Sequence, residues 1–199
     1  MAEQVIVGNV YDKYRTRNPI ARALMRGFLR AVGELYVEAR PQTVLEVGCG
    51  EGRLADHLLR RYPRPRRFAA CDLEDARAAD IDPAIDFERA SIYALPYHDR
   101  AFDLVICCEV LEHLEDPRRG LEELARVSRR HVLLSTPWEP MWRVMNLARG
   151  RYVRHLGNTP GHVQHFTRRR LLGLAGEALE VRGVRRPLPW TVLLGEIRG

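Results

Sequence analysis

Three glycines alternate with other residues in one short stretch, where an apolar run ends. Gly48, Gly50 and Gly52 follow a β-branched, strand-like segment and precede a segment with helical periodicity. Glycine lets the backbone turn sharply, and the missing side chains let a ligand approach the main chain. The first turn of the following helix also presents free N–H groups. The stretch predicts a cradle for a small ligand, although a dinucleotide site or a plain tight turn can have a similar glycine content.

Two acidic residues narrow the choice of ligand. The spacing G-x-G-x-G differs from the G-x-G-x-x-G that binds a pyrophosphate, and Glu46 stands two positions before the first glycine. A carboxylate there would repel a pyrophosphate but suits the ammonium group of an amino-acid moiety. Asp72 ends the next strand-like run, 20 positions after Gly52. A carboxylate at that place can accept hydrogen bonds from both ribose hydroxyls.

A second set of residues could do acid–base or metal chemistry. Glu109, Glu112 and His113 are spaced i, i+3, i+4, so one helix face could carry all three. Such a face could hold a divalent metal, His113 could act as a base without metal, or the set could orient a pocket and pack the helix. His162 and His165 precede a predicted helix, where they could bind an acceptor, remove its proton, or form a hydrogen-bonded turn.

The elements that must position these residues alternate between strand and helix patterns. Apolar or β-branched runs predict strands, a spacing of three and four predicts helices, and Asn18 and Thr167 can cap two of them. The predicted strands cover 43–47, 68–72, 85–90, 102–108, 131–135 and two segments within 180–197; the predicted helices cover 19–36, 53–59, 109–114, 118–128, 138–149 and 168–179. This order predicts an α/β fold, a doubly wound, mostly parallel, seven-stranded Rossmann-like sheet with helices on both faces. Such sheets bind ligands at the carboxyl ends of their strands, where the motifs fall.

The composition indicates a globular protein with an excess of positive charge. The 199 residues carry a formal charge of +6, and Lys13 is the only lysine, so arginine supplies nearly all of it. The arginine clusters could be solvated surface or could meet an anionic partner; their scatter, without interleaved aromatic residues, disfavours nucleic acid. No apolar run reaches 18 residues, and the N-terminus lacks a secretory pattern. Four cysteines without C-x-x-C spacing favour a reducing, cytoplasmic setting.

The motifs taken together resemble one enzyme family. The run Val44–Gly52 is similar to the first motif of class I S-adenosylmethionine-dependent methyltransferases, of the type seen in quinone biosynthesis and small-molecule methylation. Cys71-Asp72-Leu73 resembles their acidic motif, and Ser91–Pro96 followed by Phe102–Val105 resembles their third-strand turn and fourth strand. Glu109–Leu114 is similar to the run that follows. The resemblance covers roughly residues 11–172 and implies S-adenosylmethionine as cofactor and S-adenosylhomocysteine as product.

The resemblance also implies which residues bind the cofactor. The glycine loop would cradle the methionine part, Asp72 would take the ribose and Leu73 would pack on the adenine. Many relatives have an aspartate where Ser91 stands, so that contact to adenine is weaker here or runs through the hydroxyl. The full set is Tyr11, Tyr14, Glu46, Gly48, Cys49, Gly50, Gly52, Asp72, Leu73, Ser91, Ile92, Cys108 and Glu109. Within it, the two tyrosines would fold over the cofactor, unless they are ordinary surface aromatics.

The resemblance is less specific about the acceptor. The compact chain favours a small-molecule acceptor, with oxygen the expected atom, and His113, His162 and His165 are the candidate catalytic residues. Glu112-His113 is also similar to metal-using relatives, namely small-RNA terminal 2′-O-methyltransferases and quinone-biosynthesis O-methyltransferases. Metal-dependent 2′-O-methylation of RNA is therefore one alternative function. A non-catalytic protein that binds S-adenosylmethionine is the other.

The implied organisation is a single methyltransferase domain over 1–199. Within it, 1–40 is expected to form an N-terminal helical cap, and 138–170 an insertion on the acceptor side. No metal ligand is assigned, no membrane span is expected, and the sequence leaves the oligomeric state open.

Overall fold

The computed structural model describes residues 16, 18–139, 141–142, 145 and 163–198. Its core is a seven-stranded sheet with the order β3-β2-β1-β4-β5-β7-β6. β7 runs antiparallel to both of its neighbours, and the other neighbouring strands are parallel. The predicted doubly wound, mostly parallel α/β sheet is thus confirmed. The strands are β1 (Thr43–Val47), β2 (Arg67–Asp72), β3 (Ile85–Arg89), β4 (Phe102–Cys108), β5 (Ser128–Pro137), β6 (Leu179–Arg185) and β7 (Trp190–Ile197).

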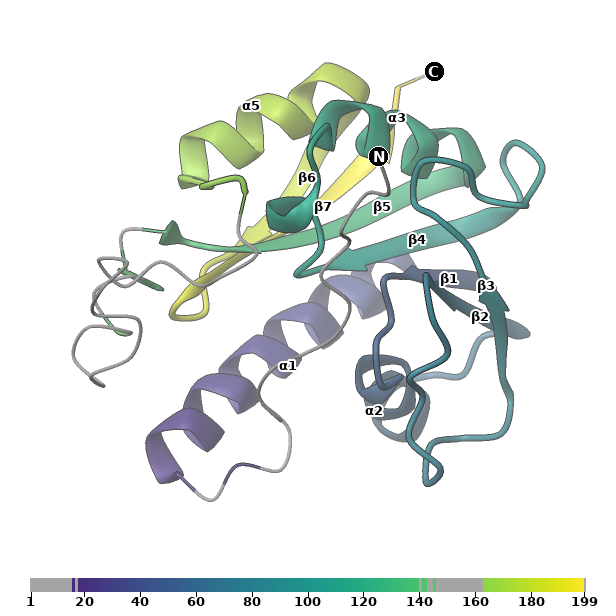
Figure 1. The fold of residues 1–199 in the computed structure, drawn as a ribbon, viewed down its shortest axis with the longest axis horizontal. Coiled ribbons are helices and arrows are strands. Elements are labelled where there is room, and N and C mark those ends of the chain that lie inside the picture. Colours follow the sequence, from purple (N-terminus) through teal and green to yellow (C-terminus); the bar gives the residue numbers. More distant parts are fainter. Residues whose placement is uncertain (1–15, 17, 140, 143–144, 146–162, 199) are drawn as a thin grey trace, which may run out of the picture.

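Helices cover both faces of the sheet (Figure 1). α1 (Pro19–Ala39) and α2 (Arg53–Arg61) pack on one face, and α3 (Pro117–Val127) and α5 (Arg168–Ala178) pack on the other. A short 3₁₀ helix, η1 (Leu111–His113), lies between β4 and α3. Within the described residues, no helix is long and apolar enough to span a membrane.

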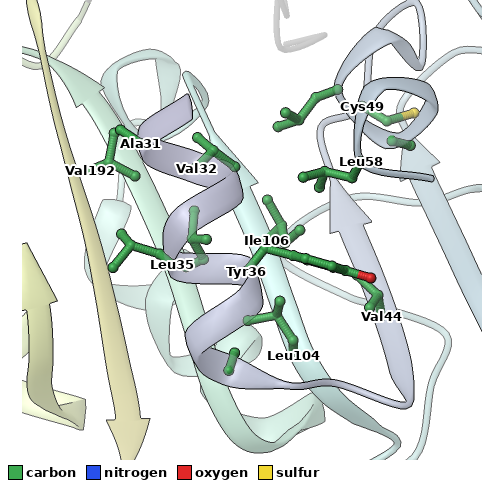
Figure 2. Packing of buried hydrophobic residues seen from close by; sticks show 14 of the residues in the cluster. Ala31, Val32, Leu35, Tyr36, Val44, Cys49, Leu58, Leu104, Ile106 and Val192 are labelled. Atoms are coloured by element: carbon green, nitrogen blue, oxygen red, sulfur yellow. The ribbon is translucent and has the colours of Figure 1, made fainter. Parts of the chain in front are cut away.

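α1 shows how the sequence pattern becomes packing. The side chain of Asn18 accepts hydrogen bonds from the N–H groups of Ile20 and Ala21, so the helix begins where its cap predicts. Residues three and four apart then share one face. Figure 2 shows Val32 and Leu35 pointing from that face toward the strands. Both side chains are fully buried, and each burial contributes roughly 1.5–3 kcal/mol of hydrophobic stabilisation.

The parallel register brings three strand ends to one edge of the sheet. β1 lies between β2 and β4, and Val47 of β1 stands opposite Cys71 of β2. β4 pairs with β5, so that Cys108 stands opposite Ser135. The segments after β1, β2 and β4 therefore leave the sheet at the same edge. The chain reverses its direction of travel across the sheet between β1 and β4, and such a switch point forms a crevice for ligands.

The segment after β4 differs from the predicted helix over 109–114. The N–H of Glu109 donates to the carbonyl of Ser135 (3.2 Å), which extends the pairing of β4 with β5. The φ of Glu109 is 61°, in the left-handed region, so the chain turns instead of entering a helix. Only residues 111–113 are helical, in a single 3₁₀ turn. Because α3 begins at Pro117 with its own cap, too few residues remain for an α-helix.

Candidate functional site

The glycine loop after β1 folds against the end of β2. The N–H groups of Gly48 and Cys49 both donate to the carbonyl of Cys71, at 2.8 and 3.1 Å. Gly48 and Gly50 have φ values of 75° and 51°, in the left-handed region that favours glycine. A Cβ atom on Gly48 would overlap the side chain of Val110, whereas a Cβ on Gly50 would meet no described atom within 4 Å. The fold itself therefore requires glycine at position 48, while Gly50 borders open space.

Asp72 lies directly beside this loop. Its Oδ2 accepts a hydrogen bond from the N–H of Gly50 (2.7 Å), and its Oδ1 accepts one from the N–H of Leu73 (2.7 Å). These bonds fix the carboxylate between the loop and the end of β2. The side chain of Leu73 is exposed beside it. A ribose joined to a flat apolar ring fits this pairing of a carboxylate with an apolar surface.

Glu46 supplies a buried acidic group at the base of the loop. Only 4% of the residue is exposed, and its Oε2 has no hydrogen-bond partner among the described residues. The pKa of this carboxyl is raised from 4.5 to about 8, mainly by burial, which outweighs a lowering hydrogen bond from the backbone of Ala55; the charge of Asp72 adds a smaller rise. A buried carboxyl oxygen without a partner is costly, and an ammonium group would satisfy it. The loop residues therefore fit a ligand that carries an amino-acid ammonium group and a ribose.

The other residues predicted for the cofactor have less polar surroundings. Burial raises the pKa of the thiols of Cys49 and Cys108, so both side chains stay protonated and behave as small apolar groups. The hydroxyl of Ser91 accepts a hydrogen bond from a backbone N–H two residues later (3.3 Å), and Ile92 is buried beside it. Three predicted residues lie outside the described residues: Tyr11, Tyr14 and His162.

Two side chains hold Glu109 at the end of β4. Its Oε1 accepts a hydrogen bond from the hydroxyl of Ser135 (3.1 Å), and its Oε2 accepts one from the indole N–H of Trp190 (2.7 Å). Trp190 begins β7, and the antiparallel pairing with β5 returns it to this edge, opposite Pro137. Neither Ser135 nor Trp190 was expected here from the sequence. The direction of the last strand could have predicted this contact, because an antiparallel β7 must start beside the end of β5.

Glu112 and His113 have different surroundings. Glu112 is buried and His113 is exposed, so the predicted helix face shared with Glu109 is wrong. The backbone carbonyl of Glu112 accepts hydrogen bonds from the N–H groups of Val163 and Gln164, both at 3.0 Å, and so anchors the later loop. Among the residues that the structure describes, no group of three or more His, Cys, Asp or Glu side chains is arranged to hold a metal ion.

His165 lies just before α5 and faces a carboxylate that the sequence did not point to. Its Nδ1 is 3.6 Å from Oε1 of Glu139, which is buried, while 45% of the His165 side chain is exposed. The N–H of Glu139 donates to the carbonyl of Phe166 (3.1 Å), which ties the two segments together. Thr167 caps α5 as predicted. The structure thus pairs an exposed imidazole with a buried carboxylate.

Known proteins share the part of the chain that forms this site. A family model described as a methyltransferase domain matches residues 45–135. Norajmaline N-methyltransferase of Rauvolfia serpentina is 28% identical over 96 residues, which cover 45% of this chain and 33% of that protein. Malonyl-[acyl-carrier protein] O-methyltransferase of Hahella chejuensis is 34% identical over 115 residues, which cover 53% of this chain and 41% of that protein. The chain therefore spans about a third to two fifths of the length of these curated relatives.

A solved structure shares the fold over nearly the whole chain. Magnesium protoporphyrin IX methyltransferase from Synechocystis PCC 6803, crystallised with bound SAH (S-adenosylhomocysteine), aligns with a TM-score of 0.65 at 16% identity. The alignment covers 92% of this chain and 89% of that one. The matched domain, the similar proteins and the shared fold agree with the geometry of the loop and its two carboxyl groups. Residues 45–135 of the chain therefore form a methyltransferase domain of the class I S-adenosylmethionine-dependent type, whose cofactor is S-adenosylmethionine.

Proposed function

We propose that this chain transfers the methyl group of S-adenosylmethionine to a small-molecule acceptor. The observation that carries the proposal is the joint placement of Glu46, Gly50 and Asp72 at the switch point of the sheet. Each of the three has a chemical reason to be there that a plain turn does not explain. The names of the similar proteins, which include an N- and an O-methyltransferase, support methyl transfer as the activity.

The chain's own residues would act mainly by binding and alignment. S-adenosylmethionine supplies a methyl group already activated on a sulfonium. Glu46 would hold its ammonium group, Asp72 its ribose hydroxyls and Leu73 its adenine, while Cys108 and Glu109 would line the side of the sulfonium. Because the methyl group needs no covalent activation by the protein, fixed positions for donor and acceptor supply much of the rate.

Asp72→Ala should weaken the binding of S-adenosylmethionine by roughly 1.5–3 kcal/mol, the worth of a charge-assisted hydrogen bond. The dissociation constant should therefore rise about 10- to 150-fold, which isothermal titration calorimetry measures. Asp72→Asn is the control, because it keeps an oxygen that can accept the hydrogen bond from Gly50, and it should lose less affinity. An Asp72→Ala variant that binds like the wild type would remove Asp72 from the site.

The ion pairs support a small acceptor over RNA. Many arginines already face carboxylates on the same surface, which leaves less unpaired positive charge for a phosphate backbone. An RNA substrate would bind with an affinity that falls steeply with salt, so a salt titration separates the two functions. The paired arginines include Arg60 with Asp56, Arg64 with Asp82, Arg118 with Glu177, Arg182 with Glu180 and Glu196, and Arg185 with Glu34 and Glu38.

We further propose that the segments before and after the cofactor motifs in the sequence shape the acceptor site. Residues 1–40 would form the N-terminal helical cap, and residues 138–170 the insertion on the acceptor side. A site built from these two short segments suits a metabolite better than a folded macromolecule. A cytoplasmic location stays a prediction from the cysteine usage.

An oxygen acceptor is the candidate that His165 and Glu139 favour. A hydroxyl must lose its proton during attack, and an imidazole with a carboxylate beside Nδ1 is suited to remove it through Nε2. With a hydroxyl acceptor, His165→Gln should lower kcat at least about 100-fold and leave the dissociation constant of S-adenosylmethionine unchanged. Glu139→Gln should give a smaller loss. The rate of S-adenosylhomocysteine formation measures kcat for both variants, and calorimetry measures the dissociation constant. If His165→Gln lowers cofactor binding and turnover equally, His165 is a packing residue.

A further inference from the structure

The segment after β5 and the segment that enters α5 form two side-chain pairs with each other. One pair is Glu139 with His165, which contains the proposed base. The other is Trp138, which directly follows β5, with Arg168 in the first turn of α5. The Cζ atom of the Arg168 guanidinium lies 3.9 Å from the centroid of the Trp138 ring. The stacked pair of Trp138 and Arg168 therefore neighbours the proposed base on both segments.

Hydrogen bonds hold the stacked pair at the carboxyl edge of the sheet. The N–H of Trp138 donates to the carbonyl of Pro189 (2.8 Å), just before β7. Trp138 also comes three residues after Ser135, whose hydroxyl bonds to Glu109 (3.1 Å). The end of β5 thus leads from the residues predicted to bind the cofactor to the stacked pair.

The stacked pair borders solvent and does not lie in the core. The side chains of Trp138 and Arg168 are both partly exposed, and 45% of the His165 side chain is exposed. The indole, the guanidinium and the imidazole are therefore all accessible on the same two segments. A dissolved molecule can meet all three groups.

The guanidinium of Arg168 offers donors that no described residue accepts. Its Nε is buried, and among the described residues no acceptor bonds to this atom. No carboxylate in the described part of the chain forms an ion pair with Arg168. Arg170 differs, because it donates to Oε1 of Gln164 (2.6 Å) and to the carbonyl of His165 (3.0 Å). A buried donor without an acceptor is unfavourable, and a ligand that carries an acceptor would satisfy it.

Stacking on an indole leaves the hydrogen-bond donors of a guanidinium available. The cation–π contact uses the flat face of the group, whereas its five N–H donors lie in the plane and point outward. A carboxylate matches this fork with two parallel hydrogen bonds. The single positive charge of Arg168 also matches the single negative charge of a carboxylate.

We infer that Arg168 binds a carboxylate of the acceptor, while Trp138 holds the guanidinium in place. This inference rests on the proposed methyl transfer and specifies the acceptor of that same site as a hydroxy acid. Arg168 would hold the carboxylate, and the hydroxyl would reach His165. The hydroxyl oxygen then forms the new oxygen–carbon bond while the sulfur–carbon bond breaks and its electron pair stays on sulfur. The hydroxyl proton passes to Nε2 of His165, and the product is a methyl ether.

The first test detects a carboxylate at Arg168 without methyl transfer. A buried Nε–H exchanges slowly with water, so proton–nitrogen correlation NMR can observe it, and its absence from Arg168→Lys assigns the signal. In the protein with bound S-adenosylhomocysteine, benzoate should shift this signal, and its uncharged match benzamide should not. A signal that ignores benzoate, or that benzamide shifts equally, overturns the inference. A shift with inorganic phosphate but not with benzoate overturns the assignment to a carboxylate.

Matched variants separate a built site from general positive charge. The benzoate titration is repeated on each variant and followed by the indole N–H signal of Trp138. Arg168→Gln should weaken benzoate binding at least about tenfold, and Arg168→Lys should weaken it less, because lysine keeps the charge without the fork. Arg169→Gln, at the next arginine of α5, is exposed and serves as the control, with a change of less than about twofold. Equal losses in the two glutamine variants overturn the inference.

Calorimetry with S-adenosylhomocysteine shows whose carboxylate Arg168 binds. The cofactor carries a carboxylate of its own, on its amino-acid part. Arg168→Gln should leave the affinity for S-adenosylhomocysteine unchanged, because the carboxylate in question belongs to the acceptor. A loss of that affinity in a variant whose thermal unfolding matches the wild type would assign Arg168 to the cofactor and overturn the inference.

The second test compares acceptors that differ only in the acidic group. Transfer of a radiolabelled methyl group is measured for para-hydroxybenzoate against para-hydroxybenzamide, and for mandelate against mandelamide. The acids should have the lower KM, and Arg168→Gln should raise that KM at least about tenfold while leaving kcat nearly unchanged. A preference for the amides, or a methyl ester as product, overturns the inference. A protein that binds benzoate at Arg168 and binds S-adenosylmethionine, yet methylates neither class, would instead overturn the proposed function.

Discussion

Replacing Glu46 with glutamine should stabilise the free protein at pH 9 by on the order of 5 kcal/mol. Burial raises the pKa of this carboxyl from 4.5 to about 8 in the folded protein. Each unit of pKa difference between folded and unfolded chains corresponds to about 1.36 kcal/mol. Glutamine has the same shape and no charge, so the substitution removes the cost of ionising a buried group.

The gain in stability depends on pH in a defined direction. Below pH 4.5 the carboxyl is protonated in both the folded and the unfolded chain, so its ionisation does not change the free energy of unfolding. Between pH 4.5 and about 8 the unfolded chain has released the proton and the folded chain retains it, so the wild type loses stability as pH rises. The free energies of unfolding of the wild type and of Glu46→Gln should differ by less than about 1 kcal/mol near pH 5. Above pH 8 the difference should be larger and constant. Urea unfolding at several pH values measures this, and a gap independent of pH contradicts the prediction.

The same substitution should have the opposite effect on binding. Without its carboxylate partner, the ammonium group of S-adenosylmethionine would be buried beside a neutral amide, at a cost of roughly 3–5 kcal/mol. Calorimetry should therefore show binding weakened by at least about 100-fold. Glu122→Gln, at an exposed glutamate on α3, is the matched control and should change neither stability nor affinity. A residue that destabilises the free fold and strengthens ligand binding is one placed for the ligand.

Gly50→Ala should abolish measurable cofactor binding while costing the free protein only about 1–2 kcal/mol. The new Cβ would meet no described atom within 4 Å, so the cost to the fold comes from the φ of 51°. The methyl group would instead occupy the open side of the loop, where the cofactor must approach the main chain.

Gly48→Ala provides the matched comparison. Its Cβ would overlap Val110 in addition to adopting a φ of 75°, so it should destabilise the fold by roughly 3 kcal/mol or more. Thermal unfolding and calorimetry on both variants separate the two glycines. A Gly50→Ala protein that binds S-adenosylmethionine like the wild type would show that this side of the loop does not hold the cofactor.

Elements with clear periodicity and caps were predictable from the sequence. The cap at Asn18 fixed the start of α1, and the apolar run of β4 fixed a strand buried on both faces. The segment over 109–114 was not predictable, because its residues suit a helix locally while the pairing of Glu109 with Ser135 prevails in the folded chain. The start of β5 at Ser128 was missed for a similar reason, since polar arginines follow it.

The residues of the candidate site also fall into those that local sequence patterns predict and those that they do not. Glu46, the glycines and Asp72 are close in sequence, so their types and spacing carry the geometry of the loop. The support of Glu109 by Trp190 joins residues 81 positions apart and depends on the direction in which β7 pairs. The approach of Glu139 to His165 likewise depends on how the segment after β5 packs against the entrance to α5. No local pattern carries such information.

The position of β7 between β5 and β6 has a consequence for the order of assembly during synthesis. β6 has no neighbouring strand until residues 190–197 have left the ribosome, because its pairing in the described sheet is with β7. The glycine loop and Asp72 depend on β1 and β2, which are made early. Trp190, which completes the support of Glu109, comes near the end. A nascent chain can thus complete the pairing of β1 with β2 around the glycine loop and Asp72 well before the contact between Trp190 and Glu109.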